Sequence, residues 1–144
     1  MAEAYTRVLV AIDGSEKSEK AFEEAIEIAK RNDATIFLTW IINDVELTTS
    51  AYAFSRLLKD EQQNIEEDME EKAKIAEQAG VKNIERIVEI GSPKEMLAMD
   101  LPKEHDIDLI VMGSTGKGAI AQALVGSTTS FVVNHAPCNV MVIK

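Results

Sequence analysis

Short apolar runs alternate along the chain with longer stretches in which apolar residues recur at helical spacing. An apolar run without polar alternation is typical of a strand buried on both faces of a sheet. Runs of this kind predict strands at residues 8–12, 35–42, 109–112 and 139–143, and a less apolar run, the third along the chain, predicts a strand at residues 83–90. The third run carries Glu85, Arg86 and Glu89, so we expect it at an edge of the sheet.

The stretches between these runs predict helices. They cover residues 16–31, residues 48–79, a short segment that starts at Pro93 with Ser92 as N-cap, and residues 128–134. The long second helix ends at Gly80 as its C-cap, although residues 48–50 could instead belong to a loop near a ligand. Its acidic residues from 66 to 71 predict a solvated face, with an acidic docking surface as the alternative. The side chains expected to be buried on the last two helices are Met96, Leu97, Leu101, Phe131, Val132 and Val133.

The alternation of strands and helices predicts an α/β fold. We expect a three-layer open sandwich, in which a five-stranded parallel sheet has helices on both faces. The pattern alone does not fix the order of the strands. The length of 144 residues, without an internal repeat or a linker, predicts a single domain over residues 1–144.

Glycines and small hydroxyl residues follow the fourth predicted strand. Gly113, Gly116 and Gly118 come first, and Gly126 precedes Ser127 near the start of the last predicted helix. Glycine lets backbone N–H groups approach an anion closely, and a helix N-terminus adds about half a positive charge. The pattern favours a phosphate-binding loop, with a flexible surface loop as the alternative.

Two common phosphate-binding motifs do not account for these glycines. A Walker loop needs glycine where Val111 stands and a hydroxyl where Gly118 stands. The spacing Gly116-x-Gly118-x-x-Ala121 matches the dinucleotide fingerprint, but that fingerprint follows the first strand of its fold rather than the fourth.

The spacing Gly113-x-x-Gly116, nine residues, then Gly126-Ser127 resembles the ATP-binding signature of the universal stress protein family. The resemblance extends over nearly the whole chain, through VLVAIDGS near the N-terminus, DLIVMGSTG before the glycines and a short final strand. It implies the strand order 3-2-1-4-5. In that order the first and fourth strands are neighbours, and Asp13 and Gly113 line one crevice beyond their carboxyl ends.

The same resemblance implies which residues contact ATP. It assigns Asp13 to the ribose, with the alternative that this residue only starts a turn. It places Ala11 and Ile41 beside adenine, with ordinary core positions as the alternative. The positions implied to contact phosphates are Gly113, Gly116, Gly126 and Ser127, flanked by Met112 and Thr128. A divalent ion, Mg²⁺ or Mn²⁺, would arrive with the phosphates.

No catalytic residue is predicted. Position 115, where many relatives carry histidine, is Thr115, which puts efficient hydrolysis in doubt. Lys117 would either reach the outer phosphates or remain in solvent. His105 is expected at the surface and His135 at a helix C-terminus, and no spacing of His, Cys or Asp predicts a metal site built by the protein.

The composition narrows the range of partners. The formal net charge of −10 argues against nucleic acid and anionic membranes, which bind basic surfaces. It does not exclude ATP, because charges more than about 8 Å apart are largely screened at physiological salt. The chain has no leader pattern and no transmembrane run, so we expect a cytoplasmic protein. The single cysteine, Cys138, is expected to be buried and inert.

Three functions remain open from the sequence. The first is an ATP-binding stress or signalling protein in which the nucleotide orders residues 43–53. The second is a slow ATPase or phosphotransferase that uses the same site, and the third is an interaction module without nucleotide. Intact glycines argue against the third, since without a phosphate each would be free to vary. The last strand is an apolar edge that relatives commonly pair, which predicts a homodimer.

Overall fold

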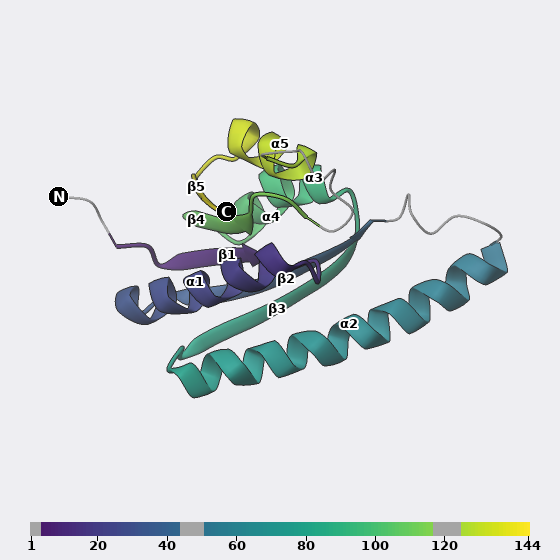
Figure 1. Cartoon of the computed structure of the whole chain (residues 1–144), viewed down its shortest axis with the longest axis horizontal. Coiled ribbons are helices and arrows are strands. Elements are labelled where there is room, and N and C mark those ends of the chain that lie inside the picture. The colour runs from purple at the N-terminus through teal and green to yellow at the C-terminus, as the bar shows by residue number, and fades with distance from the viewer. Residues whose placement is uncertain (1–3, 44–50, 117–124) are drawn as a thin grey trace.

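The computed structural model describes residues 4–43, 51–116 and 125–144, with the backbone alone over residues 51–58. A parallel five-stranded sheet in the order β3-β2-β1-β4-β5 forms its centre (Figure 1). The strands are β1 (Arg7–Ala11), β2 (Thr35–Asn43), β3 (Asn83–Gly91), β4 (Leu109–Gly113) and β5 (Asn139–Ile143). The predicted α/β class, the strand order and the edge position of β3 are confirmed.

Helices cover both faces of the sheet (Figure 1). One face carries α1 (Glu16–Asn32) and α2 (Ala51–Ala79). The other face carries α3 (Pro93–Glu95), a π-helical turn η2 (Met96–Asp100), α4 (Leu101–Glu104) and α5 (Ser127–His135). The predicted start of the long helix at residue 48, and most of the segment 43–53, lie outside the described residues.

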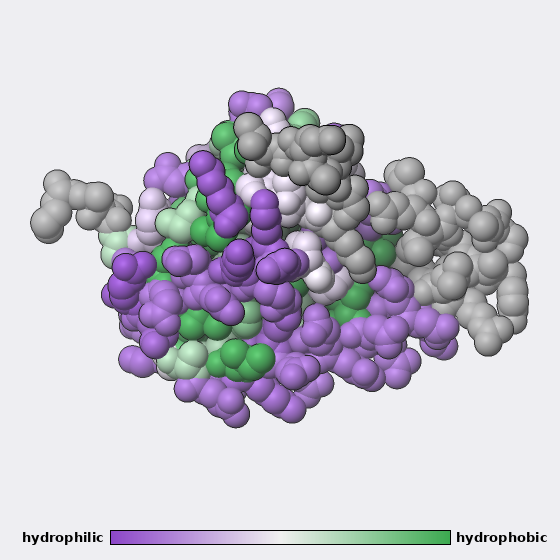
Figure 2. All heavy atoms as spheres, viewed as in Figure 1, coloured by the Kyte–Doolittle hydropathy of each residue, from purple (hydrophilic) through white to green (hydrophobic). Residues whose placement is uncertain are grey.

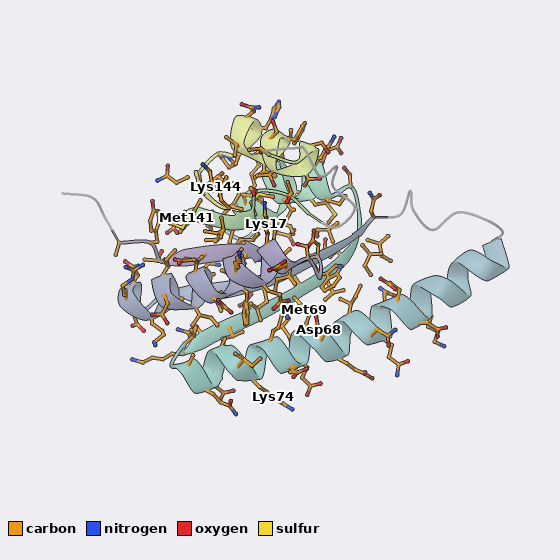
Figure 3. The ribbon with its side chains drawn as sticks, in the orientation of Figure 1. Lys17, Asp68, Met69, Lys74, Met141 and Lys144 are labelled. Atoms are coloured by element: carbon orange, nitrogen blue, oxygen red, sulfur yellow. The ribbon has the colours of Figure 1, made fainter. Side chains whose placement is uncertain are left out.

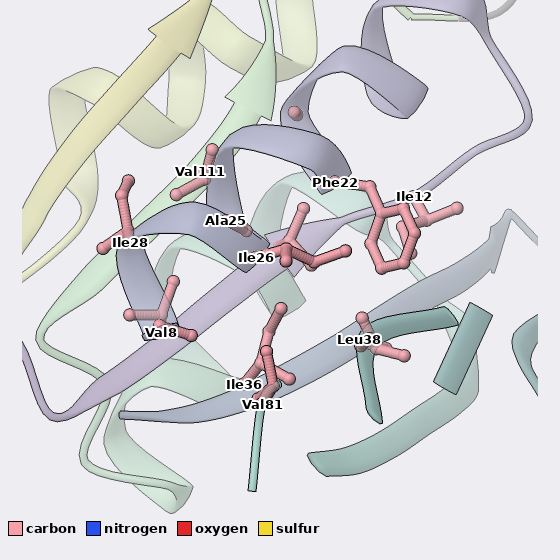
Figure 4. Packing of buried hydrophobic residues seen from close by; sticks show 14 of the residues in the cluster. Val8, Ile12, Phe22, Ala25, Ile26, Ile28, Ile36, Leu38, Val81 and Val111 are labelled. Carbon is pink, nitrogen blue, oxygen red and sulfur yellow. The ribbon is translucent and has the colours of Figure 1, made fainter. Parts of the chain in front are cut away.

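Each face of the sheet has its own apolar cluster, because the side chains of a strand point alternately to its two faces. The first cluster lies beneath α1 and α2, and Figure 4 shows part of it: Val8, Ile36, Leu38 and Val111 from the strands, with Phe22, Ala25 and Ile26 from α1. The second joins Leu9, Phe37, Ile110 and Met112 to Leu97, Leu101 and Val132. The unbroken apolar runs of the central strands are therefore explained by burial on both faces.

Local capping sets the ends of the two long helices. The Ser15 hydroxyl caps α1 by accepting a hydrogen bond from Ser18 N at 3.2 Å. Asp33 ends α1 in the left-handed conformation, with φ 53°. Gly80, with φ 112°, follows the last residue of α2, which confirms the predicted glycine C-cap.

The segment after β3 is less regular than the single short helix that the sequence predicts. Pro102 has no N–H to donate to residue 98, and its ring crowds that carbonyl. The chain widens into the π-helical turn, where Leu101 N bonds to Met96 O. Ser92 occupies the predicted N-cap position, but its side chain makes no capping hydrogen bond.

Three burial predictions for the shorter helices are wrong, and one of them concerns Phe131, which is half-buried. Met96 is half-buried, whereas Leu97 and Leu101 are buried as expected. On α5, Val132 is fully buried but Val133 is 49% exposed. A nine-residue helix that packs through one face cannot bury adjacent positions equally, because successive side chains are 100° apart.

The outer face of α2 is hydrophilic, as predicted (Figure 2). The exposed acidic residues there include Glu66, Glu67, Glu70 and Glu71. One cation on this helix, Lys72, is buried instead. Its Nζ lies 2.7 Å from Glu19 Oε1 and 3.8 Å from Asp68 Oδ2, over the ring of Phe22. Lys72 thus joins α2 to α1 rather than belonging to the solvated face.

Candidate functional site

The carboxyl ends of β1 and β4 bring two distant loops together. These strands are paired neighbours, with Val10 opposite Val111. A Cβ atom on Gly116 would lie 2.5 Å from Asp13 Oδ2, so the backbone of the glycine loop directly adjoins this carboxylate. The two motifs are therefore neighbours at this edge of the sheet, as the strand order implied, and we call the region between them the crevice.

Asp13 also fixes the turn that leads into α1. Its Oδ1 accepts a hydrogen bond from Ser15 N at 2.9 Å, and its own N–H donates to Ser18 Oγ at 3.3 Å. The carboxylate is half-buried. Asp13 therefore does start the turn, and its Oδ2 lies beside Gly116, so both assignments made for this residue remain compatible with the structure.

The second glycine segment closes the other side of the crevice. Gly126 N donates to Ser114 O at 2.6 Å, and Gly126 is the N-cap of α5. The first hydrogen bond of this helix runs from Ser130 N to Gly126 O, so Ser127, Thr128 and Thr129 have no partner for their N–H groups within the helix. Amides of this kind, with the helix dipole behind them, can bind an anion.

A buried hydroxyl ties α5 to the end of β4. Thr129 Oγ1 donates to Gly113 O at 2.7 Å, and the Thr129 side chain is almost fully buried. This hydrogen bond holds the first turn of α5 against the residues that precede the glycine loop. The helix N-terminus and the loop therefore form one unit.

The three glycines of the signature differ in the space that a side chain would have at each position. A Cβ on Gly113 would lie 2.8 Å from Lys17 Cβ and 3.0 Å from the backbone carbon of Lys17, so close packing of α1 requires this glycine. A Cβ on Gly116 would collide with Asp13. At Gly126 the nearest atom, Thr115 Cα, would be 3.4 Å away, which is ordinary contact. The argument that the glycines would be free to vary without a phosphate is thus wrong for Gly113, which meets backbone atoms of Lys17, whereas at Gly116 the clashing atom is the end of the Asp13 side chain, which can move aside.

The residues expected beside adenine lie on the sheet face of the second cluster. Ala11 and Ile41 are half-buried there, next to the half-buried Met96 and Phe131. Met112 is 4% exposed and belongs to the interior of the same cluster. The face provides an apolar surface beside the crevice, and its residues also serve as ordinary core.

One cation at this edge was not predicted. Lys17, in the first turn of α1, is half-buried, and its Nζ donates to Ser114 Oγ at 3.1 Å (Figure 3). The sequence did contain a signal for this lysine, which is its position. It comes four residues after Asp13, in the first turn of a helix, where the positive end of the helix dipole disfavours a cation. Lys117, which the sequence did single out, lies outside the described residues.

The remaining polar candidates lie apart from this crevice. His135 Nδ1 is 2.9 Å from Phe131 O in the last turn of α5, as expected for a histidine at a helix C-terminus. His105 is half-buried, with its ring 5.3 Å from that of Phe37. Cys138 is half-buried rather than buried; desolvation raises the pKa of its thiol, and the Asp108 carboxylate raises it further.

The described part of the chain contains neither a group of metal ligands nor a membrane-spanning helix. In residues 4–43, 51–116 and 125–144, no three His, Cys, Asp or Glu side chains are grouped so that they could hold a metal ion. Over the same residues, no helix has the length and apolar character needed to cross a membrane.

Comparisons with known proteins agree with this architecture. The model of the universal stress protein family matches residues 4–144. A Staphylococcus saprophyticus protein assigned to these stress proteins is 36% identical over 141 residues, which cover 97% of this chain and 84% of that protein. The structure of the universal stress protein UspA from Lactobacillus plantarum superimposes with a TM-score of 0.92 at 37% identity, over 100% of both chains.

A further solved structure of a universal stress protein is in complex with cAMP. It has a TM-score of 0.69 and 27% identity, and the match covers 99% of this chain and 98% of that one. The family match over nearly the whole length and the identity to relatives lead to one conclusion. This chain belongs to the universal stress protein family.

Proposed function

We propose that this protein binds ATP in the crevice between the carboxyl ends of β1 and β4. The proposal rests mainly on one observation: Asp13, Gly116 and the N-terminus of α5 lie at the same edge of the sheet. The N–H groups of Gly116, Ser127 and Thr128 would hold the phosphates, with Gly113 at the base of the loop and Gly126 as the N-cap of α5, its own N–H bonded to Ser114 O. A divalent ion, Mg²⁺ or Mn²⁺, would bind with the phosphates and keep several waters.

The nucleoside would bind next to these amides. Asp13 Oδ2 would accept a hydrogen bond from a ribose hydroxyl, and Ala11 and Ile41 would border adenine on the apolar face. The relative that was solved with cAMP supports an adenine nucleotide as the ligand class. The preference for a triphosphate follows from the glycine spacing and the number of amides that converge there.

We propose further that ATP acts as a conformational ligand in stress response or signalling, rather than as a substrate. A micromolar site represents about 8 kcal/mol of binding free energy, enough to reorganise neighbouring segments of the chain. The side chain next to the glycine loop is Thr115, whose hydroxyl is a poor general base at neutral pH.

Nucleotide release tests the proposed function directly. The purified protein is denatured and the supernatant is separated by chromatography, and protein stripped of nucleotide is then titrated with ATP and Mg²⁺ in a calorimeter. We expect adenine nucleotide in the supernatant and binding of one ATP per chain with a Kd near the micromolar range, about 8 kcal/mol. Protein that releases no nucleotide and shows no heat with millimolar ATP would contradict the proposal.

We also propose that two copies pair through the outer edge of β5. Val140 packs in the second cluster and Met141 in the first, while β4 covers only one edge of this strand. An apolar strand with an open edge is a template for pairing with a second copy.

A charge on β5 is expected to separate the two copies. Val142 belongs to neither cluster, so Val142→Lys places an ammonium group at the edge without opening the core. Light scattering should give twice the chain mass for the unaltered protein and one chain mass for this variant. An unaltered protein that is monomeric at 100 µM, roughly the concentration at which weak pairs form, would contradict the dimer.

A further inference from the structure

Lys17 is held beside the glycine loop by two features of the fold. Its Cβ and backbone pack directly on Gly113, at the distances that leave no room for a side chain there. Its Nζ then extends to Ser114 Oγ, 3.1 Å away. The stem of this lysine therefore lies against the end of β4, and its ammonium group lies beside Ser114, the first residue after that strand.

Ser114 connects the lysine to the other parts of the crevice. Its N–H donates to Ile143 O at 2.7 Å, and its carbonyl accepts from Gly126 N at 2.6 Å. The serine is 1% exposed. Nζ of Lys17 thus bonds to the residue that follows Gly113 in the chain and that accepts the hydrogen bond of Gly126 N. Its ammonium group has two further N–H donors besides the one used by Ser114 Oγ.

Among the described residues, none of the ion pairs includes Lys17. The N-terminal turn of α1 also disfavours a cation, because the helix dipole is positive there. A half-buried lysine at this position adds its charge to that of two helix N-termini, in a protein whose formal net charge is −10.

We propose that Lys17 determines the phosphate specificity of the crevice. Its ammonium contacts the outer phosphates, so that the site selects nucleotides with two or three phosphates over nucleotides with one. The inference rests on the proposed function and names the residue that sets its ligand class. The alternative is a structural role, in which the hydrogen bond to Ser114 only ties α1 to the loop.

Two variants separate the effect of the Lys17 charge from the effect of its hydrogen bond to Ser114. Lys17→Gln removes the charge but keeps a side-chain donor for Ser114, and Lys17→Arg keeps the charge. Lys20→Gln is the matched control, because Lys20 is an exposed residue on the same helix. Each stripped protein is titrated calorimetrically with ATP, ADP and AMP, and its urea unfolding is measured in parallel.

The ratio of the ATP and AMP affinities is the decisive readout. Because a hydrogen bond to a charged group contributes about 1.5–3 kcal/mol, we expect Lys17→Gln to weaken ATP binding about tenfold or more. AMP binding should change by less than about twofold, which is within the range of a small surface effect. Lys17→Arg should restore the preference for ATP, and Lys20→Gln should leave it unchanged.

The outcomes distinguish this inference from the proposed function. If Lys17→Gln lowers the ATP and AMP affinities by the same factor, or lowers neither, the lysine is structural and the inference is wrong while the proposed function stands. If the unaltered protein binds none of the three nucleotides, the proposed function fails, and the inference fails with it. Because the comparison is a ratio within each variant, partial loss of folded protein does not affect it.

Discussion

Replacing Gly116 with valine is expected to weaken ATP binding by about a hundredfold or more. A Cβ on this residue would lie 2.5 Å from Asp13 Oδ2, so the carboxylate must leave the position from which it would reach the ribose. The branched side chain would also shield the Gly116 N–H. Losing two charge-assisted hydrogen bonds of about 1.5 kcal/mol each corresponds to a factor of about one hundred in Kd. Calorimetric titration of the stripped variant with ATP measures this change.

The stability of the same variant serves as its internal control. Gly116 is exposed, so its replacement should change the free energy of unfolding by less than about 1 kcal/mol. Thr115→Val is the matched neighbour, because it changes the same loop without adding an atom beside Asp13. We expect this variant to bind ATP within about twofold of the unaltered protein. Equal ATP affinities for Gly116→Val and the unaltered protein would exclude this loop from the site.

The second large effect is a loss of stability in Gly113→Val. The Cβ would lie 2.8 Å from Lys17 Cβ and 3.0 Å from the Lys17 backbone carbon, and backbone atoms of a packed helix cannot move aside cheaply. Overpacking of this kind costs about 3 kcal/mol. Urea unfolding without nucleotide should therefore show a lower midpoint at an unchanged slope.

Gly126→Ala is the matched glycine variant for that experiment. Its backbone has φ −70°, which any residue adopts, and its nearest neighbours would be at ordinary contact distance. The free energy of unfolding should change by less than about 0.5 kcal/mol. The new methyl group would lie 3.8 Å from Gly116 N, where a phosphate would bind, so ATP affinity should fall about tenfold. If Gly113→Val unfolds at the same urea concentration as the unaltered protein, our account of this glycine is wrong.

The sequence predicts most of the fold because each element carries its own local signal. β1 and β4 are apolar without interruption since helices bury both of their faces. β3 carries charges because it lies at an edge. The order of the strands is different: it depends on contacts between distant segments, and only the family resemblance supplied it.

The details that the sequence misses depend on which segments meet. Position 113 must be glycine because Lys17 packs against it, and the buried Lys72 forms an ion pair with Glu19 of another helix. Neither partner can be inferred from local spacing. The same holds for the cation at the crevice, because Lys17 and Ser114 are 97 residues apart. The π-helical turn before Pro102 was also missed, although its signal is local: a proline inside a helical pattern indicates a broken hydrogen-bond ladder.

The central claim is that backbone amides between the ends of β1 and β4 hold the phosphates of ATP. An ¹⁵N–¹H NMR titration of the stripped protein with ATP and Mg²⁺ tests it most directly, because it reports on each amide separately. We predict that the largest shifts fall on the amides of Gly116, Ser127 and Thr128, and that AMP shifts them less. Saturating ATP that leaves these three amides unshifted, or shifts only residues of β3 or of the outer face of α2, would contradict the account.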